Sequence, residues 1–414
     1  MKYIIIGAGN RGMTYGKLAK ERGISIAAVA EKRHDRLESA GEYLNVPEAM
    51  RFADADTLLS KEKLADAAII ATQDRDHYGH VMQALKQGYD VLLEKPISPD
   101  PKECMEIEET ANRLGKTVTV CHVLRYTPFW GSIKEILDSG ELGKVVAIKH
   151  AENIGNFHMA HSFVRGNWHK EADSAPIILA KSCHDLDILL WLTGSHCKKV
   201  SAFGSLSFFR EENAPEGSSE RCLDCPEAGK CRFDAWRAYQ PALGKWPADV
   251  VCLEQTEEAL REALRTGPYG RCVFRCDNDV CDHMSILLEL EGGVTVTFSL
   301  TAQTSDVHRT IHIMCQHGEI EADDLDGRIT VTHFRANQLE APNTRTLYAN
   351  DYNSGHGGGD SGILDDFTDT MLQGGSSRSS ISQSTESHLM AFAIEQARKF
   401  GTVVELEAFR KTLL

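Results

Sequence analysis

This 414-residue chain lacks three features that would indicate other classes of protein. No apolar run approaches the roughly 18 residues of a membrane-spanning helix, which argues against a membrane protein. Basic residues are in deficit, 45 Lys and Arg against 60 Asp and Glu. Because phosphate binding needs clustered Lys and Arg, the net charge of −15 argues against nucleic acid as a partner. There is also no internal repeat or low-complexity tail, so we expect an acidic, soluble enzyme.

Length and composition predict two domains, since 414 residues exceed one typical domain and 42% hydrophobic residues suffice for real cores. The N-terminal apolar segment is interpreted as the first strand of the fold and not as a cleavable signal. We therefore expect a cytoplasmic protein. In that setting the twelve cysteines are expected to be thiols or metal ligands before disulfides.

A glycine-rich turn directly follows the apolar residues 3–6. In this G-x-G-x-x-G pattern Gly7 permits a tight turn, Gly9 lets the backbone approach a pyrophosphate, and Gly12 lets the next helix pack closely on the strand. The N-terminus of that helix, about residues 13–22, would face the phosphates. The turn therefore predicts a dinucleotide site, whose other members are Asn10 and Arg11.

The residue that ends the second predicted strand indicates which dinucleotide binds. Glu31 follows the apolar residues 24–30, 19 residues beyond Gly12, where a carboxylate can accept hydrogen bonds from a ribose diol. The same carboxylate repels the 2′-phosphate of NADP. We therefore predict NAD, with NADP the alternative because Lys32 and Arg33 could bind that phosphate.

Short apolar strands then alternate with helices along the chain. A helical stretch over residues 77–87 follows Asp74 and Asp76, either of which can cap it. This spacing predicts a parallel, right-handed, doubly wound sheet whose strand-end loops line the cofactor site. The strands are expected at residues 67–71, 90–93 and 117–121.

Four motifs, in order, make the chain resemble the Gfo/Idh/MocA oxidoreductases. They are the glycine turn, Ala71-Thr72-Gln73-Asp74 with His77, Glu94-Lys95-Pro96, and His184-Asp185-Leu186-Asp187. The resemblance covers essentially the whole chain, although a Cys-containing insertion at about 210–282 fits it poorly. It implies an α/β fold, with a Rossmann domain (1–125) and an α/β domain (126–414). The second domain would contain a large, open, mostly antiparallel sheet whose face covers the nicotinamide, and a closing helix at about 386–400.

The resemblance also implies roles for individual residues. Lys95 would contact the nicotinamide ribose and stabilise a developing alkoxide, and His184 would exchange the proton of the hydroxyl. Asp187 would either orient His184 or make a structural hydrogen bond. Tyr126 is a further catalytic candidate. The remaining cofactor-binding candidates are Thr72, Asp74, His77, Glu94, Lys95 and Arg125.

One position departs from the family pattern. Many family dehydrogenases carry an aspartate four residues before the histidine, where this chain has Ala180. Either Lys181 or another donor substitutes, or the chemistry differs from simple alcohol oxidation. We favour an NAD-dependent oxidoreductase for a secondary hydroxyl of a sugar, sugar derivative or cyclitol.

Two other functions stay open. In a redox-neutral glycosidase, transient oxidation at C3 acidifies C2–H, elimination expels the aglycone, and NAD is recycled. In a non-catalytic regulator the cofactor would only be bound, an interpretation that the presence of Lys95 and His184 disfavours.

Residues 156–169 are rich in imidazole, guanidinium and indole, groups that bind sugar hydroxyls and pyranose faces. The alternative is an exposed edge strand and loop, and a metal bound by the histidines is disfavoured. His283 beside an acidic turn and His356 in a glycine-rich loop are further candidates. The predicted contacts of the sugar or glycoside substrate are His158, His161, Arg165, Trp168, His283 and His356.

A cysteine cluster lies in the insertion, which has little apolar sequence. A C-x₂-C pair with further thiolates from nearby chain would make a tetrahedral zinc site that staples the loop. We favour structural zinc held by Cys222, Cys225, Cys231 and Cys276, while an iron–sulfur site and unligated thiols stay open. The resemblance further implies a homodimer or homotetramer formed through the C-terminal sheet.

Overall fold

The computed structural model describes residues 1–349 and 355–414, without the side chains of residues 355 and 356. Within these residues a parallel sheet of six strands has the order β3-β2-β1-β4-β5-β6, which confirms the predicted doubly wound sheet. The strands are β1 (Lys2–Ile6), β2 (Ser25–Ala30), β3 (Arg51–Phe52), β4 (Ala67–Ile70), β5 (Asp90–Leu93) and β6 (Val118–Val120).

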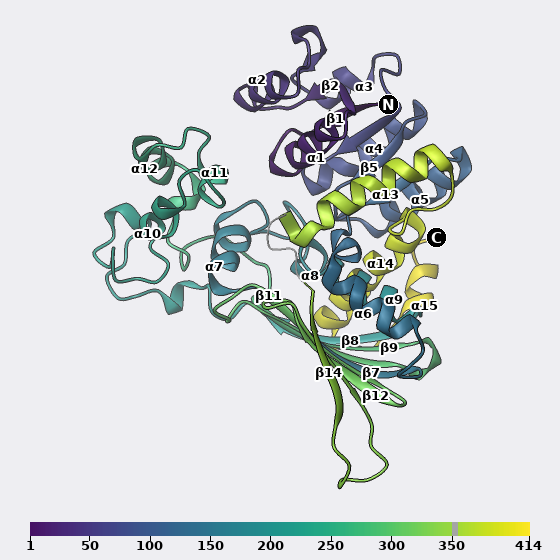
Figure 1. Ribbon diagram of the computed structural model, residues 1–414. Coiled ribbons are helices and arrows are strands. Elements are labelled where there is room, and N and C mark those ends of the chain that lie inside the picture. Colours follow the sequence, from purple (N-terminus) through teal and green to yellow (C-terminus); the bar gives the residue numbers. More distant parts are fainter. Residues whose placement is uncertain (350–354) are drawn as a thin grey trace.

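Helices cover both faces of this sheet, which explains why its strands are continuously apolar. Along β1, Ile4 and Ile6 face one helical layer, while Tyr3 and Ile5 face the other. The helices are α1 (Asn10–Glu21), α2 (His34–Tyr43), α3 (Ala55–Leu59), α4 (His77–Lys86), α5 (Pro101–Leu114) and, from late in the chain, α13 (Gly359–Gln373). Figure 1 shows α13 lying across the first domain.

A second, mostly antiparallel sheet of nine strands within the described residues has the order β14-β13-β12-β11-β7-β10-β9-β8-β15. Only β7 and β10 pair in parallel. Its strands are β7 (Val145–Asn153), β8 (Cys197–Ser205), β9 (His283–Leu290), β10 (Thr295–Thr301), β11 (His308–Cys315), β12 (Gly318–Asp323), β13 (Arg328–His333), β14 (Asn343–Tyr348) and β15 (Val404–Glu405). This confirms the expected open sheet.

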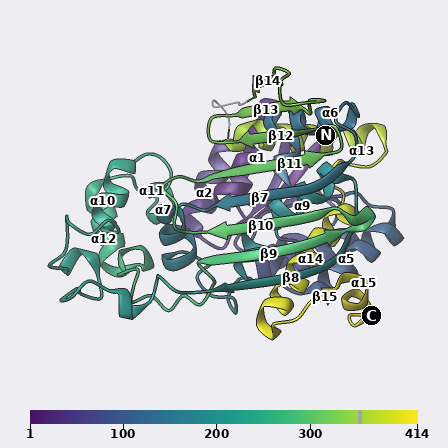
Figure 2. The ribbon, with the colours of Figure 1, turned by 90° about the horizontal axis from the view of Figure 1, so that it is seen from below.

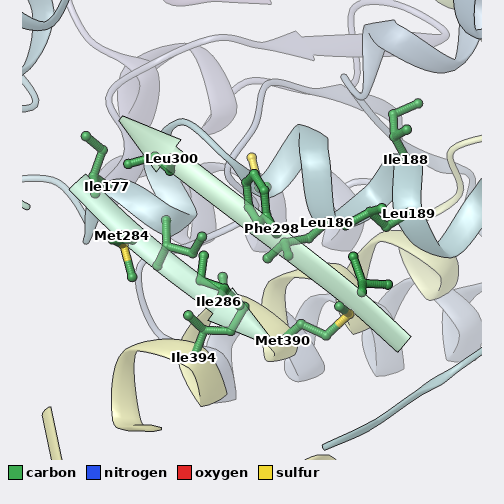
Figure 3. Packing of buried hydrophobic residues seen from close by; sticks show 14 of the residues in the cluster. Ile177, Leu186, Ile188, Leu189, Met284, Ile286, Phe298, Leu300, Met390 and Ile394 are labelled. Carbon is green, nitrogen blue, oxygen red and sulfur yellow. The ribbon is translucent and has the colours of Figure 1, made fainter. Parts of the chain in front are cut away.

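One face of the second sheet is covered by helices and the other is not (Figure 2). Figure 3 shows Leu186, Met390 and Ile394 from the covering helices packed against Ile286 and Phe298 of the sheet. These helices are α6 (Pro128–Asp138), α8 (Ile177–Ala180), α9 (Cys183–Thr193), α14 (Ile381–Phe400) and α15 (Leu406–Lys411). Alternate strand residues on the other face stay exposed, as in β9.

The insertion forms a small lobe at one side of the molecule (Figures 1 and 2). It consists of short helical pieces: η5 (Glu211–Asn213), η6 (Cys222–Asp224), α10 (Ala235–Tyr239), η7 (Gln240–Ala242), α11 (Ala248–Val251), α12 (Glu257–Thr266) and η8 (Pro268–Gly270). Other short elements are η1 (Glu48–Met50), η2 (Asp74–Asp76), η3 (Val123–Tyr126), α7 (Asn156–His158), the π-helix η4 (Met159–Arg165), η9 (Glu291–Gly293) and η10 (Gly355–Gly358). No helix in the described ranges is both long and apolar enough to span a bilayer.

Candidate active site

The glycine turn after β1 leaves no room for side chains. Gly7 has a φ of +89°, and a Cβ there would lie 2.5 Å from the carbonyl oxygen of Ala71. A Cβ on Gly12 would lie 2.0 Å from the carbonyl oxygen of Gly7. Gly9 is the N-cap of α1 and has no side chain to cap it, so the first amides of α1 are left to bind a phosphate. This backbone fits a dinucleotide.

Glu31 lies against this turn, where its Oε2 accepts a hydrogen bond of 2.9 Å from the Ala8 amide. The two cations considered for NADP have carboxylate partners. Lys32 Nζ lies 2.9 Å from Asp76 Oδ2, and Arg33 Nη2 lies 2.5 Å from Asp35 Oδ2. Asp76 thus contacts Lys32 and makes no side-chain cap on α4.

Arg11 is held by protein carboxylates. Its Nε donates to Glu94 Oε1 at 2.6 Å, and its Nη2 donates to Asp360 Oδ1 at 2.6 Å. Burial raises the pKa of Glu94, but Arg11 and Lys95 outweigh it and hold that pKa below its usual value. Arg11 therefore ties α1 to β5 and α13.

The predicted cofactor-side residues after β4 meet the loop after β5. His77 Nδ1 lies 2.7 Å from the Pro96 carbonyl oxygen, and its Nε2 lies 3.2 Å from that of Thr72. Asp74 accepts a hydrogen bond of 3.1 Å from Trp168 Nε1, and burial raises the pKa of Asp74. Trp168 is therefore placed beside the Rossmann domain.

Lys95 reaches from the end of β5 to the helices on the second sheet. Its Nζ donates to the Ala180 carbonyl oxygen at 2.9 Å. The side chain of the next residue, Lys181, is mostly buried, which lowers its pKa although Glu152 opposes this. His158 is half-buried, and burial followed by the charge of Lys181 lowers its pKa well below the usual value. These residues place the amino groups of Lys95 and Lys181 and a neutral imidazole around one site.

A buried charge network supports Lys181. Lys181 Nζ lies 3.3 Å from Glu152 Oε1, and Arg309 Nη2 lies 2.5 Å from Glu152 Oε2. Asp185 Oδ1 in turn accepts from Arg309 Nε at 2.8 Å and lies 2.8 Å from His150 Nε2. This network was not predicted from the sequence. The available signal was the pair His150 and Glu152, two polar residues with a spacing of two at inward-facing positions of β7.

His184 lies in the first turn of α9, and its ring centroid is 5.6 Å from that of the buried His122. Asp187 does not orient His184, because the Asp187 carboxylate accepts hydrogen bonds from Arg125 Nε and Nη2, both at 2.7 Å. Of the two roles considered for Asp187, the structure therefore shows the structural hydrogen bond, made with Arg125. Arg125 is buried in the same pair, and its predicted contact with the cofactor stays a prediction.

Tyr126, predicted to be catalytic, is held by α13 and the segment before α14. Its hydroxyl donates to Asp366 Oδ2 at 2.8 Å and lies 3.0 Å from Ser379 Oγ. Burial raises the pKa of Tyr126 above its usual value. These contacts tie η3 to α13, and the catalytic role of Tyr126 stays a prediction.

The histidine-rich segment forms α7 and η4, not an edge strand. His161 stacks on Tyr269 with ring centroids 4.9 Å apart, and burial lowers the pKa of His161 to about 4. Arg165 donates to the Arg271 and Phe233 carbonyl oxygens, both at 2.8 Å. Of the four predicted substrate contacts in this segment, His158 and Trp168 lie toward Lys95 or Asp74, while His161 and Arg165 turn into the insertion.

Of the two remaining histidine candidates, the structure describes the side chain of His283 alone, and it lies away from this site. His283 is exposed on the sheet face without helices, with Nδ1 2.8 Å from Asp282 Oδ1. The side chain of His356 lies outside the described residues.

The predicted zinc site is not supported. In the described chain no three His, Cys, Asp or Glu residues come close enough to hold a metal ion. Cys222, Cys225 and Cys231 line one cavity with Cys272. The fourth predicted ligand, Cys276, is not among the lining residues, and its Sγ lies 3.3 Å from the Cys272 carbonyl oxygen.

Two family models match the chain. Residues 1–122 match the oxidoreductase family with an NAD-binding Rossmann fold, and residues 130–321 match the Gfo/Idh/MocA C-terminal domain. The chain belongs to the Gfo/Idh/MocA oxidoreductase family. This confirms the resemblance that the four motifs carry, and with it a Rossmann domain of the NAD(P)-binding type.

Curated relatives are distant. A putative oxidoreductase, YteT, of Bacillus subtilis is 25% identical over 78% of this chain and 76% of its own length. An inositol 2-dehydrogenase of Corynebacterium glutamicum is 25% identical over 47% of this chain and 55% of its own. A 2,7-anhydro-N-acetylneuraminate hydratase of Mediterraneibacter gnavus is 28% identical over 49% of this chain and 52% of its own length. The chain thus spans about half the length of the last two.

Solved structures share the fold along nearly the whole chain. An oxidoreductase from Agrobacterium radiobacter, in complex with NAD+, L-tartaric acid and magnesium, has a TM-score of 0.71 at 15% identity, covering 99% of both chains. An NAD-binding oxidoreductase from Klebsiella pneumoniae has a TM-score of 0.74 at 14% identity, covering 98% of this chain and 99% of its own.

Proposed function

We propose that this Gfo/Idh/MocA protein is an NAD-dependent oxidoreductase for a secondary hydroxyl of a sugar, sugar derivative or cyclitol. The observation that carries the proposal is the Lys95 ammonium, which extends from the Rossmann sheet to the Ala180 carbonyl, next to Lys181. The named sugar and inositol enzymes among the relatives support this substrate class.

The dinucleotide would lie along the glycine turn, with its pyrophosphate at the first amides of α1 and a ribose diol at Glu31. When bound, it supplies the acceptor for the hydride. We favour NAD over NADP, because Glu31 repels a 2′-phosphate and the nearby Lys32 and Arg33 already pair with carboxylates.

The side chains then handle the proton of the hydroxyl. Lys95 stabilises the oxygen as it becomes negative, since its ammonium is held in place before the reaction. His184, in the first turn of α9, accepts the proton. His158 is neutral and offers a hydrogen-bonding group to a neighbouring hydroxyl.

A redox-neutral glycosidase is the second candidate, favoured by Lys181. Burial lowers the pKa of this lysine, so a neutral amine is available to remove the proton from C2 after transient oxidation at C3. The two candidates share Lys95 and NAD and differ in whether NADH is released.

The test is a panel of free sugars, cyclitols and aryl glycosides, assayed with added NAD or NADP. We expect NADH formation from a free sugar or cyclitol. We expect Lys95→Met to lower kcat on the order of 10²- to 10³-fold because an oxyanion-stabilising group is lost. Lys102→Met, which changes an exposed lysine of α5, is the matched control and should keep full activity.

Release of the aglycone without NADH would instead select the glycosidase. Binding of NAD with no turnover of any compound, or full activity in Lys95→Met, would contradict both enzymatic proposals.

A further inference from the structure

Four cysteines line one cavity in the insertion lobe, although they come from two separate segments. An isolated β-bridge between Arg221 and Arg271 joins these segments, and the Cys272 amide donates to the Glu220 carbonyl oxygen at 2.8 Å. The bridge places the C-x₂-C-x₅-C stretch next to a cysteine some forty residues later in the chain. The four cysteines are Cys222, Cys225, Cys231 and Cys272.

The walls of this cavity suit a buried anionic group. Phe233, Val273 and Phe274 supply apolar side chains. The buried Arg165 directs Nη2 to Cys222 Sγ at 3.3 Å, and among the described residues it has no carboxylate within ion-pair distance. This guanidinium places a positive charge beside the Cys222 sulfur, which suits an anionic group bound in the cavity.

The other polar contacts in the cavity leave the sulfurs available. Asp234 and Glu227 also line it, and the Asp234 carboxylate accepts from the Gly229 and Trp236 amides at 2.6 and 2.9 Å. The Phe233 amide donates to Cys231 Sγ at 3.4 Å. All four cysteines are free of disulfides.

The arrangement of the four cysteines around one cavity favours a larger group over a single ion. Tetrahedral zinc holds each sulfur at about 2.3 Å and so draws the sulfurs to about 3.8 Å from one another. No three metal-ligating residues in the described ranges gather closely enough for one ion, yet four thiols face a common space. A cluster with several metal atoms, each bound by one cysteine, fits sulfurs that stand further apart.

The lobe has little hydrophobic core of its own to stabilise it. Its separate apolar cluster has only four fully buried members within the described residues, namely Ala235, Tyr239, Leu260 and Leu264. Metal binding can supply folding free energy where a hydrophobic core is small.

We propose that Cys222, Cys225, Cys231 and Cys272 ligate an iron–sulfur cluster that holds the insertion lobe together. Cys272, not Cys276, is the fourth ligand. Arg165 ends η4, the helix that follows His158, so the cluster also fixes the segment that carries this residue toward Lys95.

The test compares the metal content of the full-length protein and two variants, all purified without oxygen after growth with iron. The wild type should contain iron and acid-labile sulfide in equal amounts and show broad visible absorption that dithionite bleaches. Cys272→Ser should lose both the iron and the absorption. Cys276→Ser, the matched control four residues away, should keep them.

Zinc without sulfide in the wild type would overturn the cluster, as would a protein that stays free of iron after anaerobic reconstitution with iron and sulfide. Equal loss in Cys276→Ser and Cys272→Ser would overturn the ligand assignment. If Cys272→Ser fails to fold, as judged by loss of NAD binding, the metal and sulfide content of the wild type alone decides the matter.

Discussion

Lys181 occupies a position at which a lysine can act as a base. It follows Ala180, whose carbonyl holds Lys95, and it lies 3.3 Å from the buried Glu152. Burial destabilises its charged form and lowers its pKa, while Glu152 limits this effect. The neutral amine is therefore reached at lower pH than for an exposed lysine.

This predicts the pH dependence of turnover in Lys181→Arg. If Lys181 is the base of the glycosidase reaction, the kcat of that reaction in the wild type should rise with pH as Lys181 loses its proton, in a range below the ordinary lysine pKa of about 10.4. Arginine keeps the positive charge toward Glu152 but does not deprotonate, so this rising limb should disappear. The measurement is kcat against pH. Lys102→Arg is the control, and an unchanged profile in Lys181→Arg would assign the limb to another group.

The residues that sequence could place are those whose role depends on the local chain. Gly7 and Gly12 were predictable because their constraint comes from a tight turn. The place of Lys95 directly after the strand over residues 90–93 was predictable from the Glu94-Lys95-Pro96 motif. The buried pair of Arg125 with Asp187 joins residues 62 positions apart, and no spacing rule specifies such a partner.

At the scale of elements, α14 links the two sheets through one histidine. His388 Nε2 accepts from the Ile97 amide at 2.9 Å, just after β5, and its Nδ1 lies 2.8 Å from the Ser384 carbonyl oxygen. Both contacts are satisfied by a neutral ring that donates through Nδ1. Burial, followed by the neighbouring His122, lowers the pKa of His388 to about 3.

This predicts an acid-sensitive contact between α14 and the Rossmann domain. The unfolded chain binds a proton at His388 below about pH 6.5 and the folded chain does not, so its contribution is complete above that pH. It should be lost as the pH falls toward the folded pKa, at about 1.4 kcal/mol per pH unit. In His388→Gln the amide oxygen can accept from Ile97 without titrating, so the free energy of unfolding should fall less steeply.

Urea unfolding between pH 7 and pH 5 measures this slope. His34→Gln, which changes an exposed histidine in α2, is the control and should retain the wild-type slope. The same slope in His388→Gln as in the wild type would show that His388 is not the titrating group.

Elements were predictable where hydrophobic periodicity is strong. The strand over residues 90–93 agrees with β5, and the helix over 77–87 agrees with α4 to one residue. The π-helix η4 was not predictable, because its aromatic and polar residues have no clear period. Its shape also depends on packing against Tyr239 and Tyr269 of the insertion.

At the scale of the whole molecule, the fold of a single chain leaves one face of the second sheet uncovered by helices (Figure 2). Phe203 of β8 is 73% exposed and Leu287 of β9 is 57% exposed. Ser201 pairs with Leu287 in the β8–β9 register, so Phe203 and Leu287 are diagonal neighbours on this face. Exposed apolar groups gathered on an open sheet are typical of an interface between subunits.

We therefore predict that the protein is a homodimer or homotetramer formed through this face. Phe203→Asp together with Leu287→Asp should dissociate it, because each copy would place charges in an apolar interface without partners. Light scattering coupled to size-exclusion chromatography measures the mass. Leu372→Asp places the same charge on an apolar residue of α13 that is 67% exposed, and it should leave the mass unchanged. A wild type that is monomeric at every concentration, or a double variant that keeps the wild-type mass, would show that this face is not the interface.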